Sequence, residues 1–124
     1  MPAYNFQPRF ADAVESGAKT QTIRKTRRGA KPGDTAYLYT GQRTKACRKI
    51  GEGRLISVFP ISIDRIFGAK DPAIFNHTCR QLTQEEADFF AQLDGFEDAQ
   101  ALYKWFDENH GLPFTGYVHK WILK

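Results

Sequence analysis

The segment Gly17-Ala18-Lys19-Thr20-Gln21-Thr22-Ile23-Arg24 is followed, after a basic loop, by Lys31-Pro32-Gly33-Asp34. It places a lysine, two threonines and an arginine within six residues. Threonine and isoleucine favour extended backbone, so residues 19–25 are predicted to form a strand. Hydroxyls and cations at this density suit a pocket for a polar, electron-rich ligand better than they suit a buried core strand.

The residues on either side of this segment define its neighbours. Phe10, Ala13 and Val14 lie at i, i+3 and i+4, and a glycine follows three residues later, which predicts a short helix over residues 9–16. Proline and glycine in the basic loop predict a tight turn into a strand over residues 35–40. Residues 41–53 are polar and cationic, and we predict a long connection there.

The second half of the chain adds strands and helices. Residues 54–66 carry apolar side chains at both parities, which predicts a central strand with a bend or bulge at Pro60. Thr83-Gln84-Glu85-Glu86 has the form of a capping box, and the helix after it is expected to bury Phe89 and Phe90. A second helix is predicted over residues 98–109 and a last strand over residues 117–123.

Strands outnumber helices in this order, and long βαβ repeats are absent, so a doubly wound parallel sheet is not expected. The sequence predicts an α+β fold, a small mixed β-barrel with short flanking helices. At 124 residues, with 41% hydrophobic and 14% aromatic residues, the chain is expected to form a single domain over residues 1–124.

Charge is distributed unevenly along the chain. The net charge is +4, but the segment from Lys19 to Arg54 has eleven basic residues against Asp34 and Glu52, a local balance of +9. Such a patch attracts phosphates, which favours a nucleic acid or nucleotide as the partner. A solvated basic face without a ligand is the alternative.

Several classes of protein are not expected. No apolar run approaches the length of a membrane helix, and the N-terminal residues lack a secretory pattern, so we expect no membrane association and a cytoplasmic location. Cys47 and Cys79 form no Cys-x-x-Cys pair, and His77 next to Cys79 is a weak candidate for a metal. We expect neither a metal nor a cofactor.

The candidate chemistry lies in the segment that begins at Gly17. A lysine whose pKa is lowered by burial or by nearby cations can act as a general base. A threonine hydroxyl beside it would be a nucleophile or would orient a water, and Arg24 would hold a phosphate or a carbonyl. In a regular strand Thr20, Thr22 and Arg24 share one face, and Lys19 joins them only if the strand begins after it. The alternative is that the threonines only support the strand.

Two further groups of residues are candidates. Asp94, three positions before Glu97, is expected to be the N-cap of the last helix rather than a catalytic group. The cations of the long loop are candidate phosphate contacts, although each could serve only solubility. They are Arg43, Lys45, Arg48 and Lys49.

The segment GAKTQTIR at residues 17–24, with the KPGDT turn at residues 31–35, resembles the signature of the ASCH domain family, which is related to the PUA domains. The loop at residues 41–51 resembles a longer branch of that family found in phage and prophage genes, and Asp94-Gly95-Phe96 resembles its acidic-Gly-Phe element. The resemblance covers most of the chain, from about Phe6 to the last strand.

This resemblance implies a PUA-like barrel with a cleft beside the first strand, and a partner that is RNA or a modified nucleoside. It also implies a hydrolase that removes the acetyl group from N4-acetylcytidine, or a ribonuclease. Lys19 would be the base, Thr22 the nucleophile or the group that orients water, and Asp94 the acid, where the relatives carry a longer glutamate. A non-catalytic RNA-binding module is the alternative.

Overall fold

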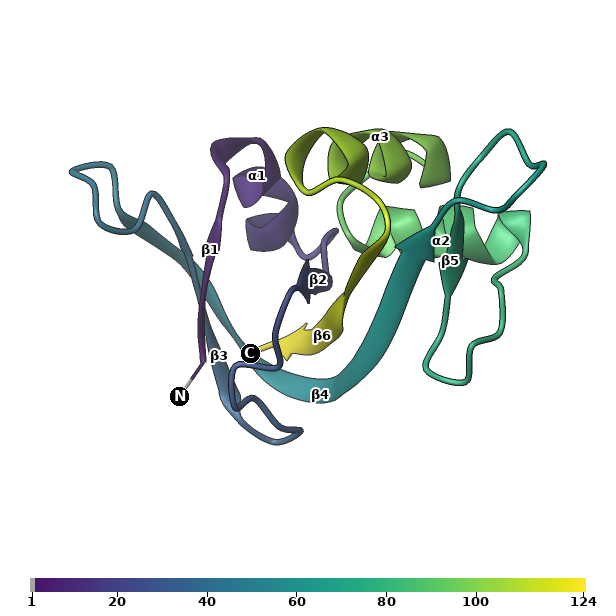
Figure 1. The fold of residues 1–124 in the computed structure, drawn as a ribbon. Helices are drawn as coiled ribbons and strands as arrows, with labels where there is room; N and C mark the ends of the chain where they lie inside the picture. The colour runs from purple at the N-terminus through teal and green to yellow at the C-terminus, as the bar shows by residue number, and fades with distance from the viewer. Residues whose placement is uncertain (1) are drawn as a thin grey trace.

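A strongly curved sheet of six strands carries three helices on one side in the computed structural model, which describes residues 2–124 (Figure 1). The elements follow the chain in the order β1 (Ala3–Phe6), α1 (Pro8–Ser16), β2 (Gln21–Arg24), β3 (Thr35–Thr40), β4 (Arg48–Asp64), β5 (Ala73–Phe75), α2 (Gln84–Leu93), α3 (Ala99–Asn109) and β6 (Phe114–Leu123). The predicted α+β class is confirmed.

The strand order is β1-β3-β4-β6-β2, and β5 pairs with β4 outside this path. All neighbours are antiparallel except β1 and β3. The predicted barrel is wrong in one respect, because β1 and β2 remain edges and the sheet does not close within residues 2–124. Instead the Arg24 guanidinium crosses this opening, and its Nη2 donates to the main-chain oxygen of Asn5 at 2.9 Å.

The central strand β4 is longer than the sequence indicated. It begins at Arg48 and not after Gly53, because residues 48–54 pair with β3. Glycine is uncommon in strands, so Gly53 gave no sign of a strand in the sequence. The position nevertheless requires glycine, because a Cβ there would lie 2.9 Å from the Trp121 side chain. The register of β4 shifts at two places, at Ile50 against β3 and between Leu55 and Ser57 against β6. No shift occurs at Pro60, which pairs with Tyr117 of β6.

The helices cover the concave face of the sheet and bury an aromatic core (Figure 1). The capping box at Thr83 is confirmed, with the hydroxyl accepting from the Glu86 amide at 3.2 Å. Asp94 is not the N-cap of α3; that role belongs to Asp98, whose carboxylate accepts from the Ala101 amide at 2.9 Å. Phe89 is 62% exposed and was wrongly expected to be buried.

None of the helices in the described part of the chain is long and apolar enough to cross a membrane.

Candidate functional site

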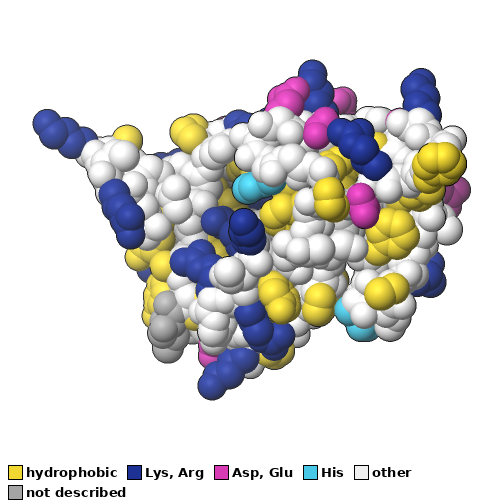
Figure 2. Space-filling view, in the orientation of Figure 1, with side chains coloured by type: hydrophobic (Ala, Val, Ile, Leu, Met, Phe, Trp, Pro, Cys, Tyr) yellow, Lys and Arg dark blue, Asp and Glu magenta, His cyan; other side chains and the backbone are white. Residues whose placement is uncertain are grey.

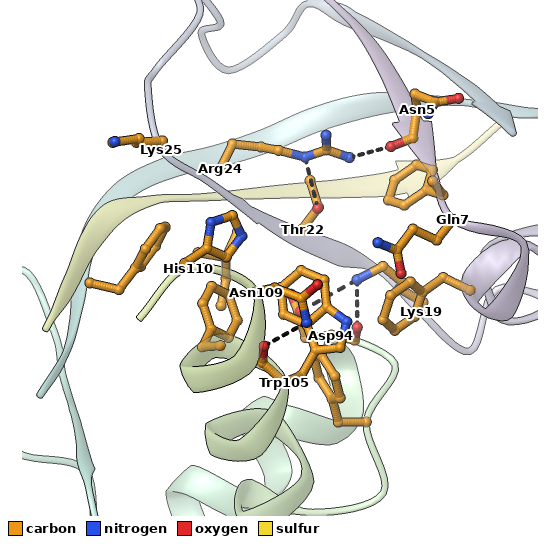
Figure 3. Close-up of a pocket in the computed structure, with 16 residues that line it drawn as sticks. Asn5, Gln7, Lys19, Thr22, Arg24, Lys25, Asp94, Trp105, Asn109 and His110 are labelled. Carbon is orange, nitrogen blue, oxygen red and sulfur yellow. Dashed lines mark hydrogen bonds and ion pairs between the residues drawn. The ribbon is translucent and has the colours of Figure 1, made fainter. Parts of the chain in front are cut away.

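A cavity of about 320 Å³ opens where the sheet fails to close, between β1, β2 and α3 (Figure 3). Its polar side chains come from four places in the chain. They are Asn5 and Gln7 around the end of β1, Lys19, Thr22, Arg24 and Lys25 in and beside β2, Asp94 after α2, and Asn109 and His110 at the end of α3. Trp105 and several phenylalanines form the apolar part of the wall. A volume of this size is that of a small-molecule site.

The start of β2 decides which side chains share the cavity. The strand begins at Gln21, so Lys19 precedes it and is not bound by strand alternation. Lys19 therefore reaches the same cavity as Thr22 and Arg24, and the condition stated from the sequence is met. Ile23, between Thr22 and Arg24 on the strand, contributes to the core and also lines part of the cavity.

Lys19 and Asp94 form a buried ion pair at the base of this cavity. Lys19 is 2% exposed and Asp94 is 4% exposed, and Nζ lies 3.4 Å from Oδ2. Nζ also donates to the main-chain oxygen of Asp94, as Figure 3 shows. The other carboxylate oxygen, Oδ1, is buried without a hydrogen-bond partner among residues 2–124. One acceptor of the pair is thus unused.

Aromatic rings lie against the Lys19 ammonium and help to bury it. Nζ lies 5.1 Å from the centre of the Phe10 ring and 5.6 Å from that of Phe6. Burial lowers the pKa of Lys19, and this effect exceeds the opposing one of the Asp94 charge. Burial also raises the pKa of Asp94 to about 6. Desolvation therefore brings the two pKa values toward each other, which favours the neutral amine and the carboxylic acid as the second form of the pair.

The Asp94-Gly95-Phe96 element has a local structural reason. Asp94 is the C-cap of α2, the Gly95 amide donates to Gln92 O, and the Phe96 amide donates to Ala91 O. These two bonds are those of a Schellman motif, which requires a left-handed residue, and Gly95 has φ +92°. The helix end thus turns the carboxylate of Asp94 inward onto Lys19.

Replacing Gly95 with Ala tests this geometry. The new Cβ would lie 3.0 Å from Cδ of Lys19 and 3.3 Å from Cδ1 of Phe10. Gly33 is the matched control, because its φ is +96° and a Cβ there meets nothing within 4 Å. We expect a loss of about 2 kcal/mol for Gly95→Ala and about 1 kcal/mol for Gly33→Ala in chemical denaturation. Equal losses would show that the approach of Lys19 to Gly95 is not tight.

Thr22 and Arg24 form the upper wall of the cavity (Figure 3). Arg24 Nε donates to Thr22 Oγ1 at 3.1 Å, so the Thr22 hydroxyl accepts one bond and has its own proton free to donate. Burial lowers the pKa of Arg24 to about 10, and the neighbouring Arg28 acts in the same direction. No hydrogen bond joins Lys19 to Thr22 within residues 2–124, so a water or ligand atom has to bridge them.

The remaining sequence candidates lie elsewhere. Thr20 does not line the cavity; its main chain bonds to Leu93 of α2 and to Trp121 of β6. The β3–β4 loop projects from the side of the molecule (Figure 1). Arg43 and Lys45, which lie in this loop, do not line the cavity. At the end of the loop, Arg48 pairs with Glu15 at 2.9 Å and Lys49 with Glu52 at 2.7 Å.

Five polar residues of the cavity were not identified as site residues from the sequence: Asn5, Gln7, Lys25, Asn109 and His110. Gln7 is the N-cap of α1 but makes no capping bond with its side chain, which points into the cavity (Figure 3). Asn109 and His110 end α3 opposite Lys19. The sequence offered only the glycine after His110, which marks a helix end and not a pocket.

The fold and the cavity define the class of this protein: a small α+β domain with a buried lysine–aspartate pair inside a ligand-sized pocket. No cluster of three or more His, Cys, Asp or Glu suited to a metal is present in residues 2–124. Comparison with protein-family models, with curated proteins and with solved structures found no significant match to this chain. The residues of the cavity are therefore the basis for assigning a function to this chain.

Proposed function

We propose that this chain is a PUA-like domain of the ASCH type that binds a modified nucleoside and hydrolyses its exocyclic amide, as in N4-acetylcytidine. The observation that carries this proposal is the Lys19–Asp94 pair, buried at the base of a cavity that Thr22 also lines. Strongly perturbed, mutually paired titratable groups in a pocket are characteristic of catalytic sites.

The shape and lining of the cavity support a nucleoside as the ligand. Enzymes that act on a single base hold it in a closed pocket, between aromatic or apolar side chains, and bond to its polar edge. Here Phe96 and Trp105 supply aromatic surface, and the carboxamides of Gln7 and Asn109 lie beside it. Figure 3 shows the Gln7 carboxamide directed toward Lys19, while that of Asn109 donates to Trp105 O at 2.8 Å and keeps its oxygen free to accept.

The pair supports the chemistry of amide hydrolysis. Lys19, as the neutral amine, accepts a proton from a water that is oriented by the Thr22 hydroxyl. The hydroxide attacks the amide carbonyl carbon, and the Lys19 ammonium formed in the same step stabilises the oxyanion. When the C–N bond breaks, Asp94, as the carboxylic acid, donates its proton to the leaving amine. The proton taken by Lys19 then returns to Asp94, so the products are the free base and the carboxylic acid.

Water is the preferred nucleophile in this scheme. Thr22 makes no hydrogen bond to Lys19, whereas Arg24 holds its oxygen in place at 3.1 Å. This arrangement suits a hydroxyl that positions water better than one that loses its proton to the lysine.

A non-catalytic RNA-binding module is the second candidate, and it rests on the excess of basic residues between Lys19 and Arg54. In that case affinity would fall steeply with salt, and Lys19 would matter only for binding. A ribonuclease would need the loop cations near the base, but Arg43, Lys45 and Arg48 do not line the cavity.

Incubation of the purified protein with N4-acetylcytidine and with a short single-stranded RNA, followed by mass spectrometry, tests the proposal. We expect cytidine and acetate from the first substrate and intact RNA from the second. Cut RNA would support the ribonuclease. If both substrates remain unchanged, the binding module becomes the better explanation.

The dependence of kcat/KM on pH follows from the pair. Burial raises the pKa of Asp94 to about 6, so below that pH the pair gains a second proton and Lys19 can no longer accept one. We expect kcat/KM to fall about tenfold for each pH unit on the acid side. The basic limb should lie below the ordinary pKa of a lysine, because burial lowers the pKa of Lys19. Asp94→Asn removes the group that protonates the leaving amine, so it should lower kcat/KM at every pH, and its remaining acid limb should follow the pKa of Lys19 alone. A flat wild-type profile would contradict this mechanism.

A further inference from the structure

Two guanidinium groups lie on the ring of one tyrosine next to the cavity. The Cζ atom of Arg24 is 5.5 Å from the centre of the Tyr4 ring, and that of Arg28 is 5.2 Å from it. Neither arginine is in an ion pair with a carboxylate among residues 2–124. Each cation gains from the ring, but together they repel, and Arg28 contributes to the lowered pKa of Arg24.

The surroundings of this pair leave its charge uncompensated. Neither acid whose charge acts on this group forms an ion pair with it: the Asp34 carboxylate accepts from the Lys31 amide at 3.2 Å, and Asp94 is paired with Lys19. Lys25, which also lines the cavity, adds a further positive charge. Figure 2 shows Lys and Arg side chains gathered beside a hollow in this face of the molecule.

The tyrosine platform under the two cations is rigid. Tyr4 is completely buried, and its hydroxyl donates to Nδ1 of His119 at 2.7 Å, while Nε2 of His119 donates to the Thr26 carbonyl at 3.2 Å. Burial lowers the pKa of His119, which keeps the imidazole neutral and fixes these directions. Arg28 has φ +58°, a conformation that residues with a Cβ adopt at a cost.

We propose that Arg24 and Arg28 bind a phosphate ester of the molecule whose base occupies the cavity. The preferred substrate would then be a nucleotide, free or within RNA, and a free nucleoside would be a poorer one. Arg24 lines the cavity and also lies on Tyr4 beside Arg28, so it joins the base pocket to the anion site. Two planar guanidinium forks side by side match the oxygens of a phosphate. That a nucleobase occupies the cavity rests on the proposed function. That Arg24 and Arg28 bind an anion does not.

The first test compares two substrates. We expect kcat/KM for N4-acetylcytidine 5′-monophosphate to exceed that for N4-acetylcytidine by about tenfold, the usual worth of one charge-assisted contact. Arg28→Gln should reduce this ratio to near one. Arg27→Gln makes the same change of charge at the adjacent exposed position and should preserve the ratio. Equal kcat/KM for both substrates in the wild type would overturn the inference and leave the proposed hydrolysis standing.

The second test does not depend on catalysis. Inorganic phosphate should raise the midpoint of thermal unfolding of the wild type and of Arg27→Gln, and it should have little effect on Arg28→Gln. This result would support the anion site even if no amide is hydrolysed, whereas equal shifts in all three proteins would overturn it. Titrations with cytidine monophosphate and with a short RNA then identify the source of the phosphate, since the true source should lose more affinity on Arg28→Gln.

Discussion

Lys19→Met is expected to lower kcat for N4-acetylcytidine by about 10³-fold, the usual contribution of a positioned general base. Methionine preserves much of the length and apolar volume of the lysine, which is 2% exposed and surrounded by Phe6 and Phe10. It removes the amine proposed to take the proton from water, together with the ion pair that this amine forms with Asp94. Because the aromatic and carboxamide lining of the cavity remains, KM should change little, and the loss should appear in kcat.

The matched control is Lys104→Met, which changes an exposed lysine on α3, the helix that lines the cavity. We expect it to keep wild-type kcat. Circular dichroism should show that both variants are folded at the assay temperature. If Lys19→Met retains kcat while folded, then Lys19 is not the base.

Asp94→Ala is expected to reduce the free energy of unfolding by about 3 kcal/mol, because it leaves Lys19 buried without its carboxylate. The main-chain oxygen of residue 94 still accepts a hydrogen bond from Lys19 Nζ. The expected loss is therefore at the lower end of the range of about 3 to 5 kcal/mol for breaking a buried ion pair. Asp107→Ala is the comparison. Asp107 pairs with Arg65 at 3.0 Å, but both side chains are exposed, so we expect a loss below about 1 kcal/mol.

The cost of Asp94→Ala should also depend on pH. In the variant the buried Lys19 has a lowered pKa, so the unfolded chain binds its proton more tightly than the folded one. Stability of the variant therefore rises with pH, and its deficit relative to wild type should shrink as the pH approaches the ordinary pKa of lysine. Urea denaturation at several pH values measures this, and a constant deficit would argue against a charged, buried Lys19.

Local signals in the sequence were sufficient for the helices. The capping box at Thr83 and the glycine after α1 specify helix ends through contacts within a few residues. The sheet was harder to predict, because pairing with β3 makes a strand of residues 48–53, whose glycines give no strand signal. Whether the sheet closes into a barrel depends on where the short edge strands β1 and β2 end. The alternation of apolar and polar residues does not determine these ends.

The site was predictable only where it depends on residues close together in the sequence. The density of Lys19, Thr22 and Arg24 in one short segment marked the segment, and the start of β2 then brought all three to one cavity. The burial of Asp94 follows from the contact of a helix end with a segment 75 residues away. The Tyr4–His119 hydrogen bond joins residues 115 positions apart. The tyrosine platform under Arg24 and Arg28 therefore could not be predicted from sequence patterns.

We propose that the buried Lys19–Asp94 pair performs amide hydrolysis on a nucleoside held in the cavity. The most direct test is a mass-spectrometric time course of N4-acetylcytidine with wild type beside Lys19→Met, with cytidine binding measured on both. We expect cytidine to accumulate only with wild type, while both proteins bind cytidine with similar affinity. Equal rates of deacetylation, or loss of binding and turnover together in the variant, would contradict the claim.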